Sequence, residues 1–253
     1  MIAAPRASPL HCENMASSPP TSSVTGASGP VETAQGKRVI RGLDADQRRA
    51  HRREQLLTAA FELIARDGYA NTSIEQICQT AYVGTKAFYE AFDSKEDCYL
   101  VLLRQVAERT ETLAAAALAQ ADDITDEELE RLLVSVFVHA LVDDPRVAVI
   151  AFGECAGISP RVERVRRENR NWTASFMEEL WRRGSWLPAS ADFDIHALAI
   201  STVGGLFEGV ADWLQPPDGG PRASVDTLIA SLTLFVSVVR RGIAASVTAP
   251  VDG

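Results

Sequence analysis

The feature that most constrains the fold is a succession of capped helical signals between residues 44 and 93. Asp44 and Gln47 have the spacing of a capping box, in which each side chain satisfies the other residue's backbone amide at a helix start. Apolar residues then recur at helical intervals until Gly68, a residue suited to a left-handed carboxyl cap. The pattern predicts a first helix over residues 45–67.

Two shorter helices are predicted to follow. Thr72 and Glu75 form a second capping-box pattern, which predicts a helix of two turns. The segment "AYVG" at residues 81–84 then breaks the pattern, and Gly84 is suited to cap a third helix. Two short helices joined by a few residues indicate a helix-turn-helix unit.

The third helix has two chemically different faces. Thr85, Lys86 and Tyr89 are predicted to face solvent, where the first turn of a recognition helix would meet the major groove of DNA. The apolar residues of the three helices are predicted to close a small core formed by Leu57, Phe61, Ile64, Ile74, Ile77, Ala81, Val83, Phe88 and Phe92.

Charge is unevenly distributed along the chain. From Lys37 to Arg53 there are seven basic and two acidic residues, a charge of +5, and the total of −9 therefore leaves −14 for the rest. This asymmetry predicts that the basic segment binds an anion, with Arg48 and Arg52 attracting phosphates. The alternative is that the basic residues only form a solvated face. Residues 1–43 are mostly rich in Pro, Ser, Thr, Ala and Gly, which predicts a disordered tail.

Helical signals continue from residue 94 to the end, and no strand pattern interrupts them. We therefore expect an all-α fold in which the helix-turn-helix unit precedes a larger helical region. Its predicted helices cover residues 95–119, 126–142, 145–156, 160–183, 192–214 and 223–245.

The last two predicted helices are apolar around most of their circumference, so they must be buried on most faces. We expect them to pack against their copies in a symmetric dimer, with Gly204, Gly205 and Gly209 allowing close approach. The alternative is that they form the internal core of a single bundle.

Neither a membrane span nor a catalytic or metal site is expected. The longest uncharged apolar run, residues 227–239, is too short for a bilayer, which favours a cytoplasmic location. No Glu-x-x-His pair, nucleophile-base pattern, phosphate loop or dinucleotide motif appears, so an enzyme, a cofactor and a metal are all disfavoured. A thiol sensor using Cys98 and Cys155 is a further alternative, and it would need a lowered thiol pKa.

Three segments together carry a family resemblance. They are "AAFELIARDGYANTSIEQI" across the first two helices, "FYEAF" in the third, and "SKEDCYL" at the start of the fourth. The stretch from Arg52 to Glu108 thus resembles the DNA-binding domain of the tetracycline-repressor (TetR) family. The resemblance implies a homodimer in which residues 44–93 bind operator DNA and residues 94–246 bind an inducer and dimerise. It implies a transcriptional regulator, most simply a repressor released by a small apolar or aromatic molecule.

The resemblance also assigns roles to individual positions. Its DNA contacts are the phosphate-binding Thr72 and Ser73, the base-facing Thr85 and Lys86, the aromatic phosphate contact Tyr89, and Lys95 at the start of the fourth helix. A lysine there opposes the helix dipole, which is reasonable if a phosphate shares the site; an exposed lysine of no consequence is the alternative. In the family, the helices that carry six further residues form the interior of the ligand domain. The resemblance therefore implies that these residues contact the inducer, or else simply belong to the core: Phe137, His139, Phe152, Trp172, Phe176 and Trp181.

Two residues of the turn depart from the family's pattern. Tyr82 stands where the family usually has a glycine, and Gly84 replaces a common serine. Because a left-handed backbone suits glycine, we expect Tyr82 to be tolerated only if the backbone there is not left-handed.

Overall fold

The structure is a computed structural model that describes residues 44–121, 124–152, 155–183, 194–215 and 221–248. These residues form helices and contain no strand, so the all-α prediction is confirmed for them. The predicted disordered tail, residues 1–43, lies outside the described residues. The helices are α1 (Ala45–Asp67), α2 (Ile74–Thr80), α3 (Thr85–Ala91), α4 (Lys95–Ala119), α5 (Asp126–Val142), α6 (Pro145–Phe152), α7 (Cys155–Ile158), α8 (Pro160–Arg183), α9 (Ile195–Leu214) and α10 (Val225–Thr248).

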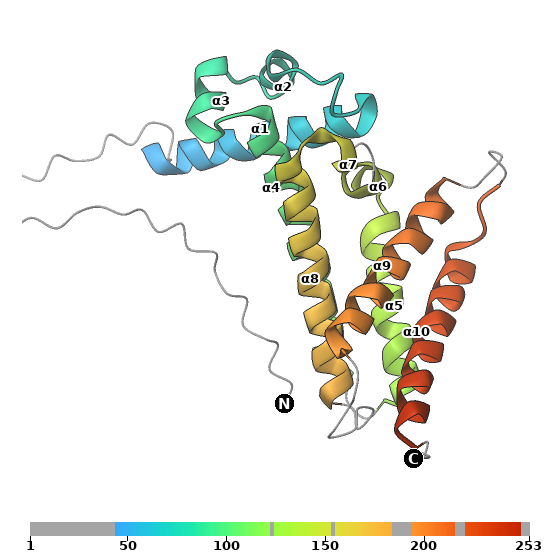
Figure 1. Cartoon of the computed structure of the whole chain (residues 1–253). Coiled ribbons are helices and arrows are strands. Elements are labelled where there is room, and N and C mark those ends of the chain that lie inside the picture. Colours follow the sequence, from blue (N-terminus) through green and yellow to red (C-terminus); the bar gives the residue numbers. More distant parts are fainter. Residues whose placement is uncertain (1–43, 122–123, 153–154, 184–193, 216–220, 249–253) are drawn as a thin grey trace, which may run out of the picture.

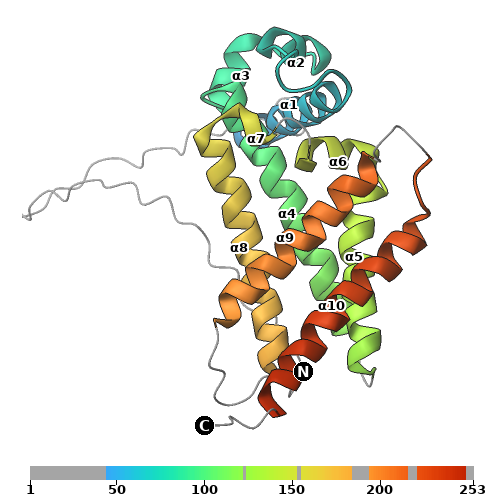
Figure 2. The same ribbon diagram turned by 45° about the vertical axis from the view of Figure 1, so that its right-hand side comes forward.

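The helices form two groups (Figures 1 and 2). Helices α1, α2 and α3 lie together at one end of the molecule, and α4 runs from them into a bundle with α5, α8, α9 and α10. Within the bundle α8 packs on α9, while α5 packs on both α10 and α4. The short helix α6 packs against α1 and so links the two groups.

Capping residues set the starts of α1 and α2. The amide of Gln47 donates to Asp44 Oδ1 at 2.8 Å and the amide of Asp44 donates to Gln47 Oε1 at 2.9 Å, which confirms the first capping box. The prediction of a box at Thr72 and Glu75 is wrong, because the box lies one residue later, at Ser73 and Gln76.

A single apolar core joins the helix-turn-helix unit to the bundle. The predicted core residues are buried or packed against this core, which confirms the predicted three-helix packing. The same core includes Ile150 of α6 and Val162 and Val165 of α8. The buried hydroxyl of Tyr99 on α4 also donates to the Ile150 carbonyl at 2.7 Å. The DNA-proximal helices are therefore fixed to the bundle through α4, α6 and α8.

The glycines of α9 serve a contact within the chain. A Cβ atom on Gly205 would lie 2.9 Å from Cζ of Phe235, and one on Gly209 would lie 2.7 Å from Cδ2 of Leu232. Both neighbours belong to α10 of the same subunit, whereas Gly204 has open space beside it. The prediction that these glycines bring two copies together is therefore wrong for Gly205 and Gly209, which let α9 and α10 approach each other.

Helix α9 and residues Val225–Ala245 of α10 are long and apolar enough to cross a membrane by length and composition. The expectation from the sequence concerned uncharged runs, whereas these two helices contain charged residues such as Glu208 and Arg240. In this fold α9 packs on α8 and α10 packs on α5. Core helices of water-soluble bundles have the same composition.

Candidate DNA-binding surface and ligand cavity

The turn between α2 and α3 is a Schellman motif. The amide of Val83 donates to the Cys78 carbonyl at 3.0 Å, and the amide of Tyr82 donates to the Gln79 carbonyl at 3.2 Å. Tyr82 occupies the position of this motif that usually holds glycine, and its φ is 54°. The expectation that Tyr82 avoids a left-handed backbone is wrong, because the hydrogen bonds on both sides of the residue require that conformation.

Helix α3 presents a polar face above a buried ring. Gly84 is its amino-terminal cap, as predicted, and makes no side-chain hydrogen bond. Phe88 is fully buried in the core and holds the helix down. Thr85 is exposed, the Lys86 side chain is 92% exposed and Tyr89 is 56% exposed. Lys86 and Tyr89 therefore face solvent, as predicted, and Thr85 is exposed while its side chain also forms a hydrogen bond with the buried Cys78.

Positive charge gathers beside α3. Arg48, Arg49 and Arg52 of α1 line a shallow depression together with Glu90 of α3. Arg49 forms an ion pair with Asp46 on its own helix, and the hydrogen bond that Arg49 donates to this carboxylate raises the pKa of Arg49. The basic patch thus lies next to the exposed face of α3, where phosphates flanking a groove would be attracted.

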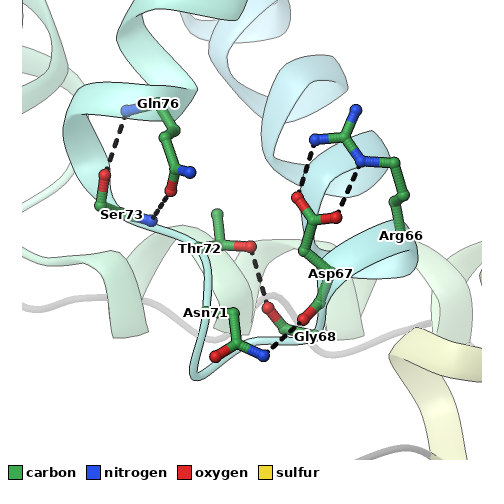
Figure 3. A network of polar contacts seen from close by, with 7 residues as sticks. All are labelled: Arg66, Asp67, Gly68, Asn71, Thr72, Ser73 and Gln76. Atoms are coloured by element: carbon green, nitrogen blue, oxygen red, sulfur yellow. Dashed lines mark hydrogen bonds and ion pairs between the residues drawn. The ribbon is translucent and has the colours of Figure 1, made fainter.

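The connection between α1 and α2 orders its own polar groups (Figure 3). The Thr72 hydroxyl points to the Gly68 carbonyl and donates to it at 2.9 Å, and Thr72 is buried. The Asn71 amide donates to the Asp67 carbonyl at 2.9 Å. Thr72 therefore does not offer its hydroxyl to a phosphate, contrary to the prediction. Ser73 accepts from the Gln76 amide at 3.2 Å and keeps its own O–H as a donor.

Lys95 is bound to the same connection. Its Nζ donates to the Tyr69 carbonyl at 2.8 Å and to the Thr72 carbonyl at 2.7 Å. The ammonium also lies 4.2 Å from the centre of the Tyr69 ring, and partial burial lowers the pKa of Lys95. Lys95 is therefore neither a freely exposed lysine nor one directed at a phosphate. Its hydrogen bonds join the start of α4 to the α1–α2 connection.

The bundle encloses a cavity of about 170 Å³. A cavity of roughly 150 Å³ can hold one benzene molecule, so this volume suits a group of about that size. Trp172 and Phe176 stack on one wall with ring centres 5.8 Å apart. Four of the predicted inducer contacts line the cavity, namely Phe137, Trp172, Phe176 and Trp181.

The other two predicted residues do not line the cavity. His139 is exposed, and its Nδ1 lies 2.8 Å from Oδ1 of Asp143 one turn further along α5. The interpretation of His139 as an interior residue is therefore wrong. Phe152 packs against the ring of Phe207, with centres 5.8 Å apart, and thus supports a lining residue from behind.

A polar stripe on α8 was missed from the sequence. Arg166, Asn169, Arg170 and Thr173 recur at helical intervals and line one side of the cavity. The Arg170 guanidinium lies over the Phe207 ring, 5.0 Å from its centre. The signal was present in "RVERVRRENRNWT", where the i, i+3, i+4, i+7 spacing of these residues defines one helical face.

A buried carboxylate lies opposite on α5. Glu130 lines the cavity and is buried, and it accepts a hydrogen bond from the Ser237 hydroxyl at 2.6 Å and another from Arg240. Both donors belong to α10. The cavity wall is therefore tied by an ion pair to the outermost helix of the bundle.

The described thiols do not suit redox sensing. Cys98 is fully buried, and burial raises its pKa to about 12, so the thiol stays protonated at neutral pH. Burial also raises the pKa of Cys78. The side chain of Cys155, the second thiol of that alternative, lies outside the described residues. Within them, no three His, Cys, Asp or Glu side chains gather closely enough to hold a metal ion.

Residues 56–102 match the model of the family described as "Bacterial regulatory proteins, tetR family". A curated relative, the HTH-type transcriptional regulator HbdR of Aromatoleum sp. (strain CIB), is 33% identical over 100 residues. That match covers 39% of this chain and 42% of the relative's length.

Solved structures share the fold at low sequence identity. The transcriptional regulator FadR from Bacillus subtilis, solved with stearoyl-CoA, has a TM-score of 0.58 at 19% identity, covering 75% of this chain and 98% of FadR. AibR, solved with isovaleryl coenzyme A and operator DNA, has a TM-score of 0.53 at 16% identity, covering 72% of this chain and 96% of AibR.

Proposed function

Because residues 56–102 of this chain match the model of the tetR family of bacterial regulatory proteins, we propose that it is a DNA-binding transcriptional regulator that responds to a small molecule. One observation carries the proposal. Phe88 anchors α3 in the core, while Thr85, Lys86 and Tyr89 project from its other face. A short helix presented in this way fits the major groove of duplex DNA.

The proposed DNA contacts divide by chemistry. Thr85 and Lys86 reach base edges from the first turn of α3, and Tyr89 reaches a phosphate. Arg48 and Arg52 supply attraction that is independent of sequence, and the Ser73 hydroxyl donates to a phosphate at the start of α2. Thr72 and Lys95 act indirectly, because they order the connection that positions α2.

A homodimer is the proposed assembly, and α10 is the proposed interface. Leu234, Phe235 and Val238 lie within one turn of α10 and are 65%, 38% and 60% exposed in the single chain. Exposed apolar groups so close together mark an interaction surface. A symmetric pair would present two α3 helices to successive major grooves of one operator.

The lining and the volume of the cavity restrict the chemical class and the size of the proposed inducer. Its walls are mainly apolar, and one side carries Arg170 together with Arg166, whose guanidinium is also paired with Glu163. FadR and AibR were solved with acyl-coenzyme A thioesters. We infer an inducer of the same class, with an apolar acyl or aromatic group in the cavity and an anionic part near the arginines. Because the cavity of about 170 Å³ is close in volume to one that holds a single benzene molecule, a short branched or single-ring acyl group fits better than a stearoyl chain.

Release from DNA would follow from a shift between two conformations. In the released conformation the two recognition helices no longer match successive major grooves. The ligand needs to favour this conformation by only about 1–3 kcal/mol, the usual coupling free energy between two sites. Regulation in the cytoplasm, and not catalysis, is the role that this family favours.

The test of DNA binding uses fluorescent duplexes that tile the promoter region next to the protein's own gene. We expect one duplex to bind tightly and in a salt-dependent manner, and replacement of Thr85, Lys86 and Tyr89 by alanine to abolish this binding. Arg131→Ala, at an exposed position on the bundle helix α5, is the matched control. Equal affinity of the triple variant and wild type would refute the role of α3.

The test of the inducer compares isovaleryl-CoA, an aromatic acyl-CoA, stearoyl-CoA and coenzyme A alone in thermal unfolding. At a hundredfold excess over Kd, a ligand specific to the folded protein should raise Tm by about 5–10 °C. The short and aromatic thioesters should do so and release DNA, whereas coenzyme A alone should not. Absence of any shift in Tm with the short and aromatic thioesters would refute this inducer class.

A further inference from the structure

Tyr82 combines two features that are each unfavourable in the isolated chain. Among the described residues it is the one non-glycine residue with a positive φ, 54°. It is also the most exposed large apolar side chain in these ranges, at 96%. A bulky residue with this backbone is uncommon enough to need a physical explanation.

The backbone at this position is imposed by the fold. Val83 packs against the core and donates to the Cys78 carbonyl, and these two contacts fix the chain on the far side of Tyr82. Any residue at this place must therefore adopt the left-handed conformation. Glycine adopts it without a clash, whereas the Cβ atom of tyrosine approaches the following carbonyl oxygen.

The ring does not offset that strain within the chain. With 96% of its surface exposed, Tyr82 packs against no core residue and leaves an apolar ring in water. A strained residue that does not stabilise its own fold is best explained by an external partner that it contacts.

The position of Tyr82 identifies that partner, given the proposed function. Tyr82 lies in the turn that leads into α3, three residues before Thr85. Thr85, Lys86 and Tyr89 follow it, and all four side chains are exposed. In a helix-turn-helix unit docked on DNA, the chain entering the recognition helix lies at the edge of the major groove, beside the sugar-phosphate backbone.

We propose that Tyr82 is a further DNA-contacting residue. Its phenol O–H donates a hydrogen bond to a phosphate oxygen at the groove edge, and its ring packs on the adjoining deoxyribose. A phenol supplies one donor together with a rigid apolar body, so one side chain can make both contacts. Such a contact strengthens binding without reading sequence.

The experiment measures Tm and Kd for Tyr82→Gly, Tyr82→Asn and Tyr82→Phe. Glycine and asparagine both tolerate the left-handed backbone, so each should raise Tm by about 2–4 °C. Each should also raise Kd about tenfold, on the promoter duplex and on a scrambled duplex alike. Tyr82→Phe keeps the strain and loses the hydroxyl, so Tm should stay unchanged while Kd rises several-fold on both duplexes.

Leu113→Ala, which trims a 41% exposed side chain on the bundle helix α4, is the control and should leave Kd unchanged. A raised Tm for Tyr82→Gly with a Kd within twofold of wild type would overturn the proposal, because the strain would then serve no contact. A wild-type Kd for Tyr82→Phe would overturn the phosphate hydrogen bond. If wild-type protein binds neither duplex, the proposed function itself fails and this inference fails with it.

Discussion

Replacing Lys95 by methionine tests whether this lysine stabilises the helix-turn-helix unit or binds DNA. Its Nζ donates to the carbonyls of Tyr69 and Thr72 at 2.8 and 2.7 Å. Methionine keeps the apolar stem of the side chain and removes every donor. The variant therefore removes the two hydrogen bonds and the contact of the ammonium with the Tyr69 ring, and keeps the packing of the stem.

The expected magnitude follows from these two bonds. A hydrogen bond to a charged group contributes about 1.5–3 kcal/mol, and the partial burial that lowers the pKa of Lys95 offsets part of the sum. The Tyr69 carbonyl keeps the Thr72 amide as a second donor at 3.3 Å. We therefore expect the free energy of unfolding to fall by about 2 kcal/mol, which lowers Tm by about 4–8 °C for a chain of this size.

The assay compares Lys95→Met with Lys86→Met by thermal unfolding and by DNA binding at a temperature where both variants are folded. The Lys86 side chain is 92% exposed, so its variant should keep the wild-type Tm and lose DNA affinity. Lys95→Met should show the opposite pattern. An unchanged Tm together with weaker DNA binding, and a salt dependence reduced by about one phosphate contact, would refute the structural role of Lys95.

Three further predictions concern the bundle. Tyr99→Phe should lower the free energy of unfolding by about 1–2 kcal/mol in urea, because it leaves the Ile150 carbonyl buried without its donor. Glu163 accepts hydrogen bonds from Arg166, which has the larger effect, and from Arg167, and these bonds lower its pKa from 4.5 to about 2. The ionised carboxylate therefore stabilises the fold fully above pH 4.5, and this stabilisation disappears as the pH falls towards 2. Glu163→Gln should therefore be less stable than wild type by about 1–2 kcal/mol at pH 6 and equally stable near pH 2, as measured by urea midpoints across pH. Leu234→Glu should convert the proposed dimer to monomer in sedimentation experiments, and a dimer that persists in this variant would refute the α10 interface.

The helices were predictable because their signals are local. A capping box such as Asp44 and Gln47 needs only residues three apart, and a helical apolar stripe needs only one turn of chain. The predicted bounds of the first helix and of most bundle helices consequently agree with the structure. In the segment 145–156 the structure describes α6 up to Phe152 and α7 from Cys155, and the two residues between them lie outside the described ranges.

The start of α2 shows how two local signals can compete. The sequence "TSIEQ" contains both a Thr72–Glu75 and a Ser73–Gln76 capping pattern, and spacing alone does not choose between them. Burial chooses, because Thr72 lies under the connection and uses its hydroxyl on the Gly68 carbonyl. Ser73 is left at the surface, where its oxygen can cap the helix.

The cavity was only partly predictable, because its walls come from helices distant in sequence. Aromatic residues were a reasonable choice, and Trp172 and Phe176 do line it. The prediction for His139 was wrong, because a helix in a bundle also has an outward face. His139 lies on that face and pairs there with Asp143. Arg170 was overlooked because charged residues are rarely assigned to an interior, although a guanidinium can lie over an aromatic ring there.

Tyr82 shows the opposite relation between local preference and structure. Steric preference argued that a tyrosine would keep its backbone out of the left-handed region, yet the residue adopts φ 54°. The difference in free energy explains why: the left-handed conformation costs about 1–2 kcal/mol. Abandoning it would break the Val83 to Cys78 hydrogen bond and withdraw Val83 from the core, which costs more. The turn therefore keeps its shape with any side chain, and selection is free to place at this position whichever residue serves the surface that it faces.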